Sequence, residues 1–345
     1  MIQSSAAQMR TSPNPSVDAD SAPSSTEEPR MRVRVPATSA NLGPGFDSMG
    51  LALNLFNTVE LRLNQEFCVT IHGESAQLLP TDRSNVIVRS IDLILDRSGT
   101  LQVPPNWALH LDNQVPVASG LGSSATAIVS GLMLGNALLQ HFDPARAYRE
   151  NKLLAMAVEL EGHPDNVTPA MLGGAWLSVT ESTGPRSFPL PLPERLRFAI
   201  AVPNFPLRTE DARRVLPTHV PLADAAANSA QAARLVLALS QDNLEWLKGS
   251  FRDYLHEKYR QNLIPGFEAV RKSALRAGAL TLTLSGAGPS LLAWCDSNQT
   301  ATQAADAMTL AWRENNIECV TFVSRPSHPH PEVEFLGIPR PPVLD

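Results

Sequence analysis

The stretch PVASGLGSSATA, residues 116–127, consists largely of small residues, so its backbone amides are its main means of binding a ligand. Gly120 and Gly122 allow a tight turn and a close approach to the main chain. Apolar residues then recur at helical spacing, which places Ser123 or Ser124 where a helix N-cap would stand. Bare amides before a helix start form an anion site, most commonly for phosphate. The stretch therefore predicts a phosphate-binding loop.

Three other interpretations of this loop compete with that prediction. A glycine-rich turn before a buried helix can be plain packing. A Walker-type loop requires a lysine after its second glycine, and none stands there. Gly120, Gly122 and Ala125 satisfy a dinucleotide-binding pattern, but that pattern must directly follow a buried strand. The polar, proline-containing DNQVPVAS comes between, so the dinucleotide interpretation is weak.

Two more glycine-rich segments lie elsewhere along the chain. PATSANLGPGFDSMG, residues 36–50, contains Asn41 and Asp47 among its glycines, and LTLSGAGPSLLAW, residues 282–294, contains Gly286 and Gly288. Either one alone could be an ordinary turn. Three such loops with polar residues inside them favour a functional site, because loops carry function while strands and helices hold them in place.

Composition excludes several classes of protein. A formal net charge of -6 and the lack of a basic stripe argue against nucleic acid as a partner. Three widely spaced cysteines show neither metal-ligand nor disulfide spacing, which predicts a cytoplasmic protein. The longest apolar-leaning run, residues 125–139, is too short to cross a membrane. Residues 1–30 lack leucine and aromatic residues, so we expect a disordered tail.

Strand-like and helix-like segments interleave irregularly after residue 31, which predicts an α+β fold with two layers in each domain. Strands are expected at about 31–38, 57–64, 67–73, 106–111, 197–203, 279–285, 290–295 and 317–323. Helices are expected at about 85–97, 144–162, 222–241, 243–261 and 266–278, besides the one that follows the phosphate loop. Two domains, residues 31–180 and 181–330, and a proline-rich tail at 331–345 follow from this pattern.

The three loops, taken in order, resemble the motifs of the GHMP kinases, in the version found in members that phosphorylate L-homoserine. EGHPDNVTPAMLGG and YRQNLIPGF also match, so the resemblance spans residue 31 to about residue 323. It implies a ribosomal-protein-S5-like N-terminal domain and a ferredoxin-like C-terminal domain. Two positions depart from the usual loop: Ala118 replaces a glycine and Thr126 an alanine. A positive φ at Ala118 would cost about 1 kcal/mol relative to glycine.

The resemblance implies that ATP is a substrate and that Mg²⁺ assists its reaction. Because the phosphate loop has no lysine, a metal must balance the remaining phosphate charge, and the resemblance assigns it to Ser124 and Glu161, which would carry the catalysis. Glu159 is the competing candidate. The residues expected to contact ATP are Pro116, Val117, Ala118, Ser119, Gly120, Leu121, Gly122, Ser123, Ser124, Ala125, Thr126, Gly286 and Gly288.

The resemblance also implies an acceptor site that suits the ammonium, carboxylate and hydroxyl groups of L-homoserine. Asp47 would pair with the ammonium, and arginines would hold the carboxylate in their planar fork. Arg208 and Arg214, by contrast, are expected to be solvated. The full set expected to contact the acceptor is Asn41, Asp47, His163, Asn166, Arg213 and Arg260.

The implied activity is ATP-dependent phosphorylation of L-homoserine to O-phospho-L-homoserine, a step toward threonine, with no dedicated catalytic base. Two alternatives stay open: a kinase for another small alcohol such as mevalonate, and a nucleotide-binding regulator that has lost catalysis. The retained GLGSSA, Glu161 and GAGPS argue against the regulator. The sequence leaves the oligomeric state open, with a homodimer as one alternative.

Overall fold

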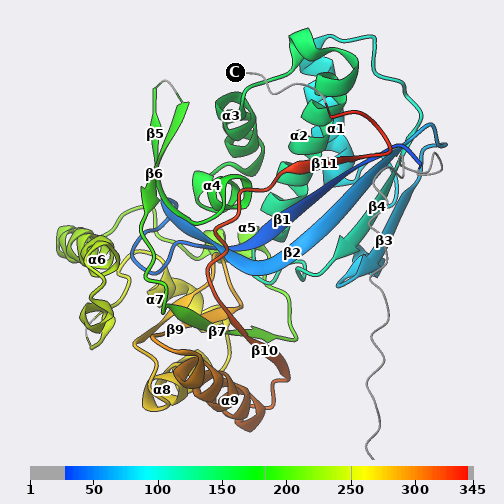
Figure 1. Ribbon diagram of the computed structural model, residues 1–345. Helices are drawn as coiled ribbons and strands as arrows, with labels where there is room; N and C mark the ends of the chain where they lie inside the picture. Colours follow the sequence, from blue (N-terminus) through cyan, green and yellow to red (C-terminus); the bar gives the residue numbers. More distant parts are fainter. Residues whose placement is uncertain (1–27, 183, 250, 341–345) are drawn as a thin grey trace, which may run out of the picture.

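The computed structural model describes residues 28–182, 184–249 and 251–340, and these form two sheets, each covered by helices (Figure 1). Most of the expected N-terminal tail and the last five residues lie outside the described residues. The first sheet contains β1 (Arg30–Ala40), β2 (Met49–Leu63), β3 (Val69–Gly73), β4 (Trp107–Asn113), β5 (Ala175–Glu181), β6 (Gly184–Leu190) and β11 (Val333–Leu336). The second contains β7 (Arg197–Pro203), β8 (Thr281–Leu284), β9 (Leu291–Cys295) and β10 (Cys319–Ser324).

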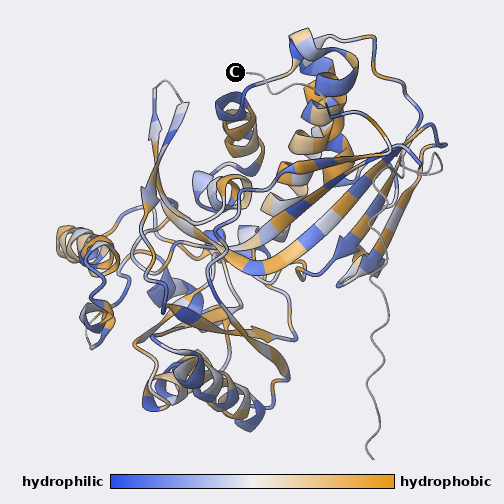
Figure 2. Ribbon diagram, in the orientation of Figure 1, coloured by the Kyte–Doolittle hydropathy of each residue, from blue (hydrophilic) through white to orange (hydrophobic). Residues whose placement is uncertain are grey.

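The first sheet has the strand order β11-β1-β2-β4-β3, and the β5–β6 hairpin pairs with the beginning of β2. Hydrophobic and polar residues alternate along β1 and β2 (Figure 2), as expected for strands with one buried face. Met31, Val33 and Val35 of β1 are fully or almost fully buried. Their core is closed by the helices α1 (Val86–Ser98), α2 (Ser123–Phe142), α3 (Glu150–Glu161) and α4 (Pro164–Leu172).

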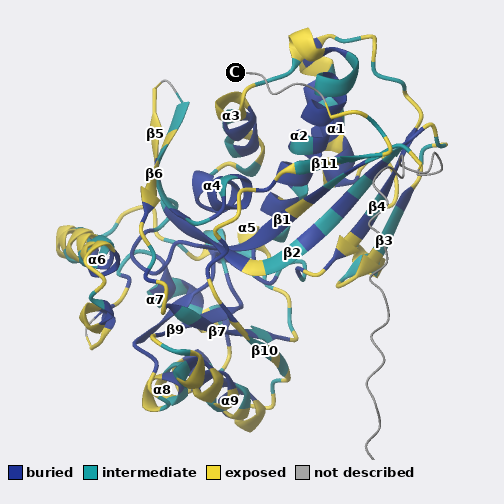
Figure 3. Cartoon of the chain, in the orientation of Figure 1, coloured by how far each residue is buried: buried dark blue, intermediate teal, exposed yellow. Residues whose placement is uncertain are grey.

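The second sheet has the antiparallel order β10-β7-β9-β8. Two helices, α8 (Phe267–Arg276) and α9 (Asn298–Glu314), cover one of its faces, and their outward sides are exposed (Figure 3). A separate apolar cluster joins residues of the first sheet, among them Leu51 and Leu53, to Phe198 and Trp294 of the second. The two domains are therefore packed against each other. The remaining helices are α5 (Thr209–Arg214), α6 (Leu222–Ser240) and α7 (Glu257–Arg260).

The structure differs from the sequence-based domain limits at two places. The expected boundary at residue 180 falls inside the β5–β6 hairpin, and the chain changes sheets only between Leu190 and Arg197. The expected proline-rich tail contains β11, which pairs with β1 and places Val333 and Phe335 against the first core. Both segments are rich in proline and show little alternation of apolar and polar residues. The sequence pattern alone therefore did not predict that they pair as strands.

Two predicted helical segments also differ from expectation, and three helices were not predicted. Of the described residues within the expected helix at 243–261, Leu244–Leu247 form a short 3₁₀ turn and Glu257–Arg260 form α7. Before α7, the side chain of Asp253 starts a new turn by accepting from the amides of residues 255–257. The predicted helix at 144–162 begins at Glu150, after the 3₁₀ turn Pro144–Arg146. The structure adds α4, α5 and α9, which were not predicted. Further 3₁₀ turns span Ala76–Leu78 and Gln261–Leu263.

Candidate active site

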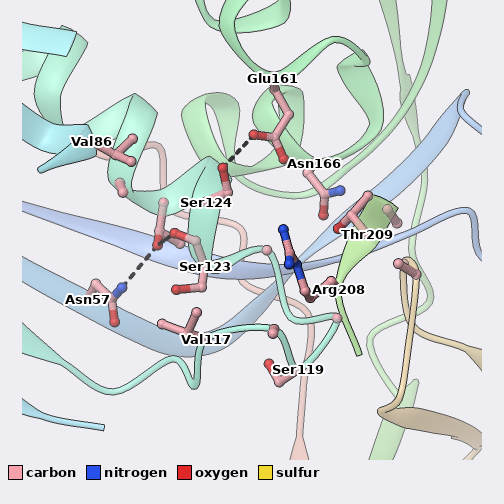
Figure 4. Close-up of a pocket in the computed structure, with 18 of the residues that line it drawn as sticks. Asn57, Val86, Val117, Ser119, Ser123, Ser124, Glu161, Asn166, Arg208 and Thr209 are labelled. Carbon is pink, nitrogen blue, oxygen red and sulfur yellow. Dashed lines mark hydrogen bonds between the residues drawn. The ribbon is translucent and has the colours of Figure 1, made fainter. Parts of the chain in front are cut away.

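The three glycine-containing loops meet around one cavity of about 330 Å³ (Figure 4). Their backbones are joined directly: the amide of Ser290 donates to Ser119 O (3.1 Å), and the amide of Gly286 donates to Ala40 O (3.2 Å). The amide of Thr38 donates to Leu121 O (3.0 Å). Segments 83 to 246 residues apart in sequence are therefore held as one unit, as the three motifs predicted.

Helix α2 begins inside this unit, but neither predicted serine is its N-cap. The N-cap is Gly122, with a left-handed φ of 71°. A Cβ at this position would overlap the Thr38 hydroxyl, so glycine is required both for its conformation and for space. The cap thus leaves the Ser124 hydroxyl free for another partner, while the first amides of the helix lack intrahelical acceptors. The loop has the features that an anion site requires.

Both unusual residues of the phosphate loop have structural consequences. Ala118 has a φ of 53°, a conformation that glycine adopts at lower cost, and its carbonyl accepts from the amide of Leu207 (3.1 Å). Thr126 is fully buried, and its hydroxyl accepts from Asn57 Nδ2 (3.0 Å) and donates to Ser123 O (2.8 Å). The threonine therefore forms a hydrogen-bonded link between β2 and the first turn of α2.

The strain at Ala118 leads to a first prediction. Ala118→Gly should raise the free energy of unfolding by about 0.5–1 kcal/mol, because relief of the left-handed conformation outweighs the extra entropy of the unfolded chain. Urea denaturation measures this change. Ala127→Gly, in the helical part of the same segment, is the control and should lower stability by about 1 kcal/mol. A loss of stability in Ala118→Gly would contradict the assignment of strain.

The two predicted metal ligands lie side by side. Ser124 Oγ donates to Glu161 Oε2 (2.8 Å), and both residues line the cavity. Burial raises the pKa of Glu161, partly offset by the bond from Ser124. The competing Glu159 lies on the outer side of α3, where it forms a two-point pair with Arg97 (2.6 and 2.9 Å).

This donor set fits Mg²⁺. One carboxylate and one hydroxyl oxygen, in a site open to phosphate oxygens and water, are typical of magnesium in phosphate-handling enzymes. Among the described residues no group of three His, Cys, Asp or Glu side chains could form a complete protein cage. The arrangement therefore suits an ion that arrives with phosphate oxygens and water, rather than one held fully by side chains.

The residues predicted to hold the acceptor include a charged pair in the cavity lining. Asp47 and Arg213 form a fork with Nη2–Oδ1 at 2.8 Å and Nη1–Oδ2 at 3.1 Å, and both side chains are roughly one third exposed. The sequence had placed them at opposite ends of a bound zwitterion, whereas the structure pairs them directly. Each Asp47 oxygen keeps a second lone pair, and the guanidinium keeps further N–H donors. The pair can still bind an ammonium and a carboxylate side by side.

Asn41 holds this end of the site in place. Its Oδ1 accepts from the amide of Asp47 (3.0 Å), and its Nδ2 donates to Gly286 O (2.9 Å). Asn41 and Asp47 both have positive φ, 70° and 54°. The side chain that was expected to contact the acceptor therefore also fixes the first loop to the third.

His163 and Asn166, from the start of α4, line the cavity beside Glu161. His163 Nδ1 lies 2.6 Å from Asp165 Oδ1. Burial alone would lower the pKa of His163, but the bond and charge of Asp165 outweigh it, so the pKa lies above its usual value. Asn166 Oδ1 accepts from Thr38 Oγ1 (2.8 Å), which leaves its Nδ2 group free to donate toward the cavity.

Arg260 also reaches the cavity, from α7. It is almost fully buried, and burial followed by the charge of Arg213 lowers its pKa to about 10, so it stays charged at neutral pH. Its guanidinium donates to Gly286 O (3.1 Å), Ala212 O (3.2 Å) and His256 Nδ1 (3.2 Å). Burial lowers the pKa of His256, whose Nε2–H donates to Gly43 O (2.9 Å). A neutral histidine thus connects Arg260 to the first loop.

Comparison with known proteins agrees with this geometry. Family models match the GHMP kinases N terminal domain at residues 85–174 and the GHMP kinases C terminal at residues 223–314. A homoserine kinase from Microchaete diplosiphon is 42% identical over 283 residues, 81% of this chain and 90% of the relative. One from Carboxydothermus hydrogenoformans is 40% identical over 295 residues, 85% and 93% of the two chains. The chain belongs to the GHMP kinase family.

A solved structure agrees as well. The homoserine kinase of Cytophaga hutchinsonii has a TM-score of 0.79 and 33% identity, covering 91% of this chain and 100% of that one. Membership in the GHMP kinases confirms the predicted two-domain α+β fold and the kinase class, and relatives of this name confirm the resemblance to homoserine-type members. None of the described helices combines the length and hydrophobicity needed to span a bilayer.

Most of the residues predicted for the site of this GHMP kinase line the cavity, and three do not. Leu121 and Ala125 are fully buried, because the loop anchors itself in the core through them, and Pro116 lies outside the lining. Sequence reasoning missed two groups. An apolar end is formed by residues from the loop before α1 and its first turn, for which no motif gave a signal: Leu79, Pro80, Val86 and Ile87. Arg208 and Thr209, just before Arg213, also line it.

A buried carboxyl group beneath the third loop leads to a second prediction. Glu257 accepts from the amide of Leu284 (2.7 Å), and burial, followed by the charge of Asp253, raises its pKa from 4.5 to about 8 against the opposing Arg271 and Arg260. Between these pH values the folded chain keeps a proton that the unfolded chain releases. The free energy of unfolding should therefore fall as the pH rises from 4.5 to 8, by up to about 1.4 kcal/mol per pH unit.

Glu257→Gln should remove this pH dependence, since glutamine resembles the protonated carboxyl and keeps an acceptor for Leu284. Urea denaturation from pH 5 to 9 should show the variant matching the parent at low pH and exceeding its stability at pH 8. Glu268→Gln, an exposed change on α8, controls for the loss of a formal charge. Parallel curves for parent and Glu257→Gln would refute the prediction.

Proposed function

We propose that this GHMP kinase transfers the terminal phosphoryl group of ATP to the hydroxyl of L-homoserine, giving O-phospho-L-homoserine, ADP and a proton. In the cell this would be a step toward threonine. The observation that carries the proposal is the Asp47–Arg213 pair in the lining of the cavity. An acceptor with both an ammonium and a carboxylate complements that pair, and one without an ammonium leaves the second lone pairs of the Asp47 oxygens without a donor.

The residues divide into two groups along the cavity. The first turn of α2 and the loops at Gly120 and Gly286 would hold the triphosphate, because their amides and close backbone approach suit phosphate oxygens. Asp47, Arg213 and Asn166 would hold the amino-acid end of the acceptor. The acceptor hydroxyl would then lie near the terminal phosphate, and positioning supplies much of the catalysis in phosphoryl transfer.

The transfer forms a bond between the hydroxyl oxygen and the terminal phosphorus as the bond to the bridging oxygen breaks. The electron pair of that bond leaves with ADP, and the hydroxyl proton passes to solvent. Asp47 is paired with Arg213, so it would anchor substrate rather than accept the proton. Mg²⁺ bound through Glu161 and Ser124 would neutralise charge on the phosphate oxygens.

Product identification tests the proposal. The full chain, supplied with ATP, Mg²⁺ and L-homoserine, should consume one ATP for each O-phosphohomoserine, identified by mass spectrometry and phosphorus NMR. A mevalonate-type kinase would instead phosphorylate mevalonate and leave homoserine unchanged. A silent regulator would bind nucleotide and turn over neither alcohol. A cytoplasmic location and a homodimer stay predictions.

A further inference from the structure

Three of the described residues that line the cavity are arginines, and they differ in what their guanidinium groups contact. Arg213 is paired with Asp47, and Arg260 is buried on backbone carbonyls. The guanidinium of Arg208 makes no close hydrogen bond with a described residue. Its nearest charged contact places Nε 3.5 Å from Glu210 Oε2, with the two side chains 73% and 69% exposed. Of the three arginines in the cavity lining, Arg208 is therefore the one whose charge is paired most weakly with other groups of the protein.

The position of Arg208 is set by the phosphate loop itself. Leu207, the preceding residue, donates its amide to Ala118 O (3.1 Å), so the backbone that carries Arg208 is attached to that loop. Arg208 then precedes α5 with an extended backbone (φ -72°, ψ 141°). Figure 4 shows its side chain directed into the cavity, between Ser123 and Asn166. It lies where the phosphate half of the site meets the acceptor half.

The phosphate loop lacks a positive charge, which the Arg208 side chain can supply. No lysine stands in residues 116–127, so no cation of the loop faces the triphosphate. One carboxylate-bound Mg²⁺ leaves much of the negative charge of ATP without a partner. A guanidinium presents parallel N–H donors that match two phosphate oxygens, and it keeps its proton at all physiological pH values.

We propose that Arg208 binds the terminal phosphate of ATP and stabilises the charge on its oxygens during transfer. It neither gains nor loses a proton in the step. The bond changes are those of the proposed phosphoryl transfer, on which the inference rests, but it does not depend on which alcohol accepts the group. Arg208 is exposed, as expected for a solvated side chain, and the proposal adds a direct contact with bound substrate.

Nucleotide titration separates this role from a surface charge. Calorimetry with Mg²⁺ and either AMP-PNP or ADP should compare the parent chain with Arg208→Gln and Arg208→Lys. Arg208→Gln should weaken AMP-PNP binding about 10-fold or more and ADP binding by less than about 3-fold, because ADP lacks the phosphate concerned. Arg208→Lys should restore part of the AMP-PNP affinity, since it keeps the charge but not the fork.

Arg214→Gln is the matched control. Arg214 lies at the end of α5, pairs with Asp211 (2.9 Å) and does not line the cavity. It should bind both nucleotides like the parent, and thermal midpoints should agree for all four chains. In turnover, Arg208→Gln should lower kcat about 10- to 100-fold, and Arg214→Gln should not.

Two results would overturn the inference: unchanged AMP-PNP affinity in Arg208→Gln, or equal losses for AMP-PNP and ADP, which would place the side chain at the inner phosphates. A parent chain that binds AMP-PNP but does not phosphorylate homoserine would contradict the proposed function instead. The difference between the two nucleotides would still decide the role of Arg208 in that case.

Discussion

Replacement of Glu161 with glutamine should lower turnover by about 100-fold or more while the fold persists. Glutamine keeps the shape and can accept from Ser124, but it removes the charge that would bind Mg²⁺ beside the phosphates. Titration with Mg²⁺ should also show a higher concentration for half-maximal activity. Ser124→Ala should cost less, because water can replace one neutral oxygen ligand. Circular dichroism and the thermal midpoint check that both variants are folded.

Glu159→Gln is the control for Glu161. It removes a carboxylate two residues earlier on the same helix, but that carboxylate pairs with Arg97 and does not line the cavity. Exposed ion pairs of this kind contribute little, so activity should stay close to that of the parent. Near-native turnover of Glu161→Gln at saturating Mg²⁺ would rule out Glu161 as the metal carboxylate.

Asp47→Asn should raise the Michaelis constant for homoserine about 10- to 150-fold and barely change that for ATP. The range follows from the loss of one charge-assisted hydrogen bond worth about 1.5–3 kcal/mol. The removed charge also frees Arg213 from its fork, so the carboxylate end of the substrate loses orientation. Arg213→Lys should weaken acceptor use as well, since a point charge cannot reproduce two parallel hydrogen bonds.

Asp211→Asn is the matched control for the aspartate. Asp211 forms an exposed pair with Arg214 on α5, and neither of these residues lines the cavity. Its loss should leave both Michaelis constants unchanged. An Asp47→Asn defect confined to ATP, with homoserine kinetics intact, would contradict the acceptor assignment and move Asp47 to the nucleotide half of the site.

The sequence predicted the parts of the site that are determined locally. A run such as GLGSSATA sets its own turn, its helix start and its exposed amides, so the phosphate loop could be predicted from neighbouring residues alone. The family resemblance then brought Asp47, Glu161 and Arg213 into one site, and the structure places all three on the cavity. A positive φ at Ala118 was expected to be strained, and Ala118 does have a positive φ in the structure.

Contacts between distant segments could not be predicted in the same way. Asp47 and Arg213 lie 166 residues apart, and the residues around either one do not indicate that the two form an ion pair. In the sequence, Arg208 resembles any exposed arginine. In the structure, the hydrogen bond from the Leu207 amide to Ala118 O attaches the neighbouring backbone to the phosphate loop. The strand β11 has four residues in a proline-rich stretch, so its identity depends on β1 as a partner.

The proposed acceptor is tested most directly by measuring kcat/KM for L-homoserine, mevalonate and 4-hydroxybutyrate in one coupled assay with the full chain. Of the two comparison alcohols, 4-hydroxybutyrate keeps the hydroxyl and carboxylate of homoserine but lacks its ammonium. If Asp47 and Arg213 bind a zwitterion, homoserine should exceed both by at least about 10-fold, the value of one charge-assisted bond. Equal kcat/KM values for homoserine and mevalonate would contradict the homoserine assignment, although the chain would still be a kinase.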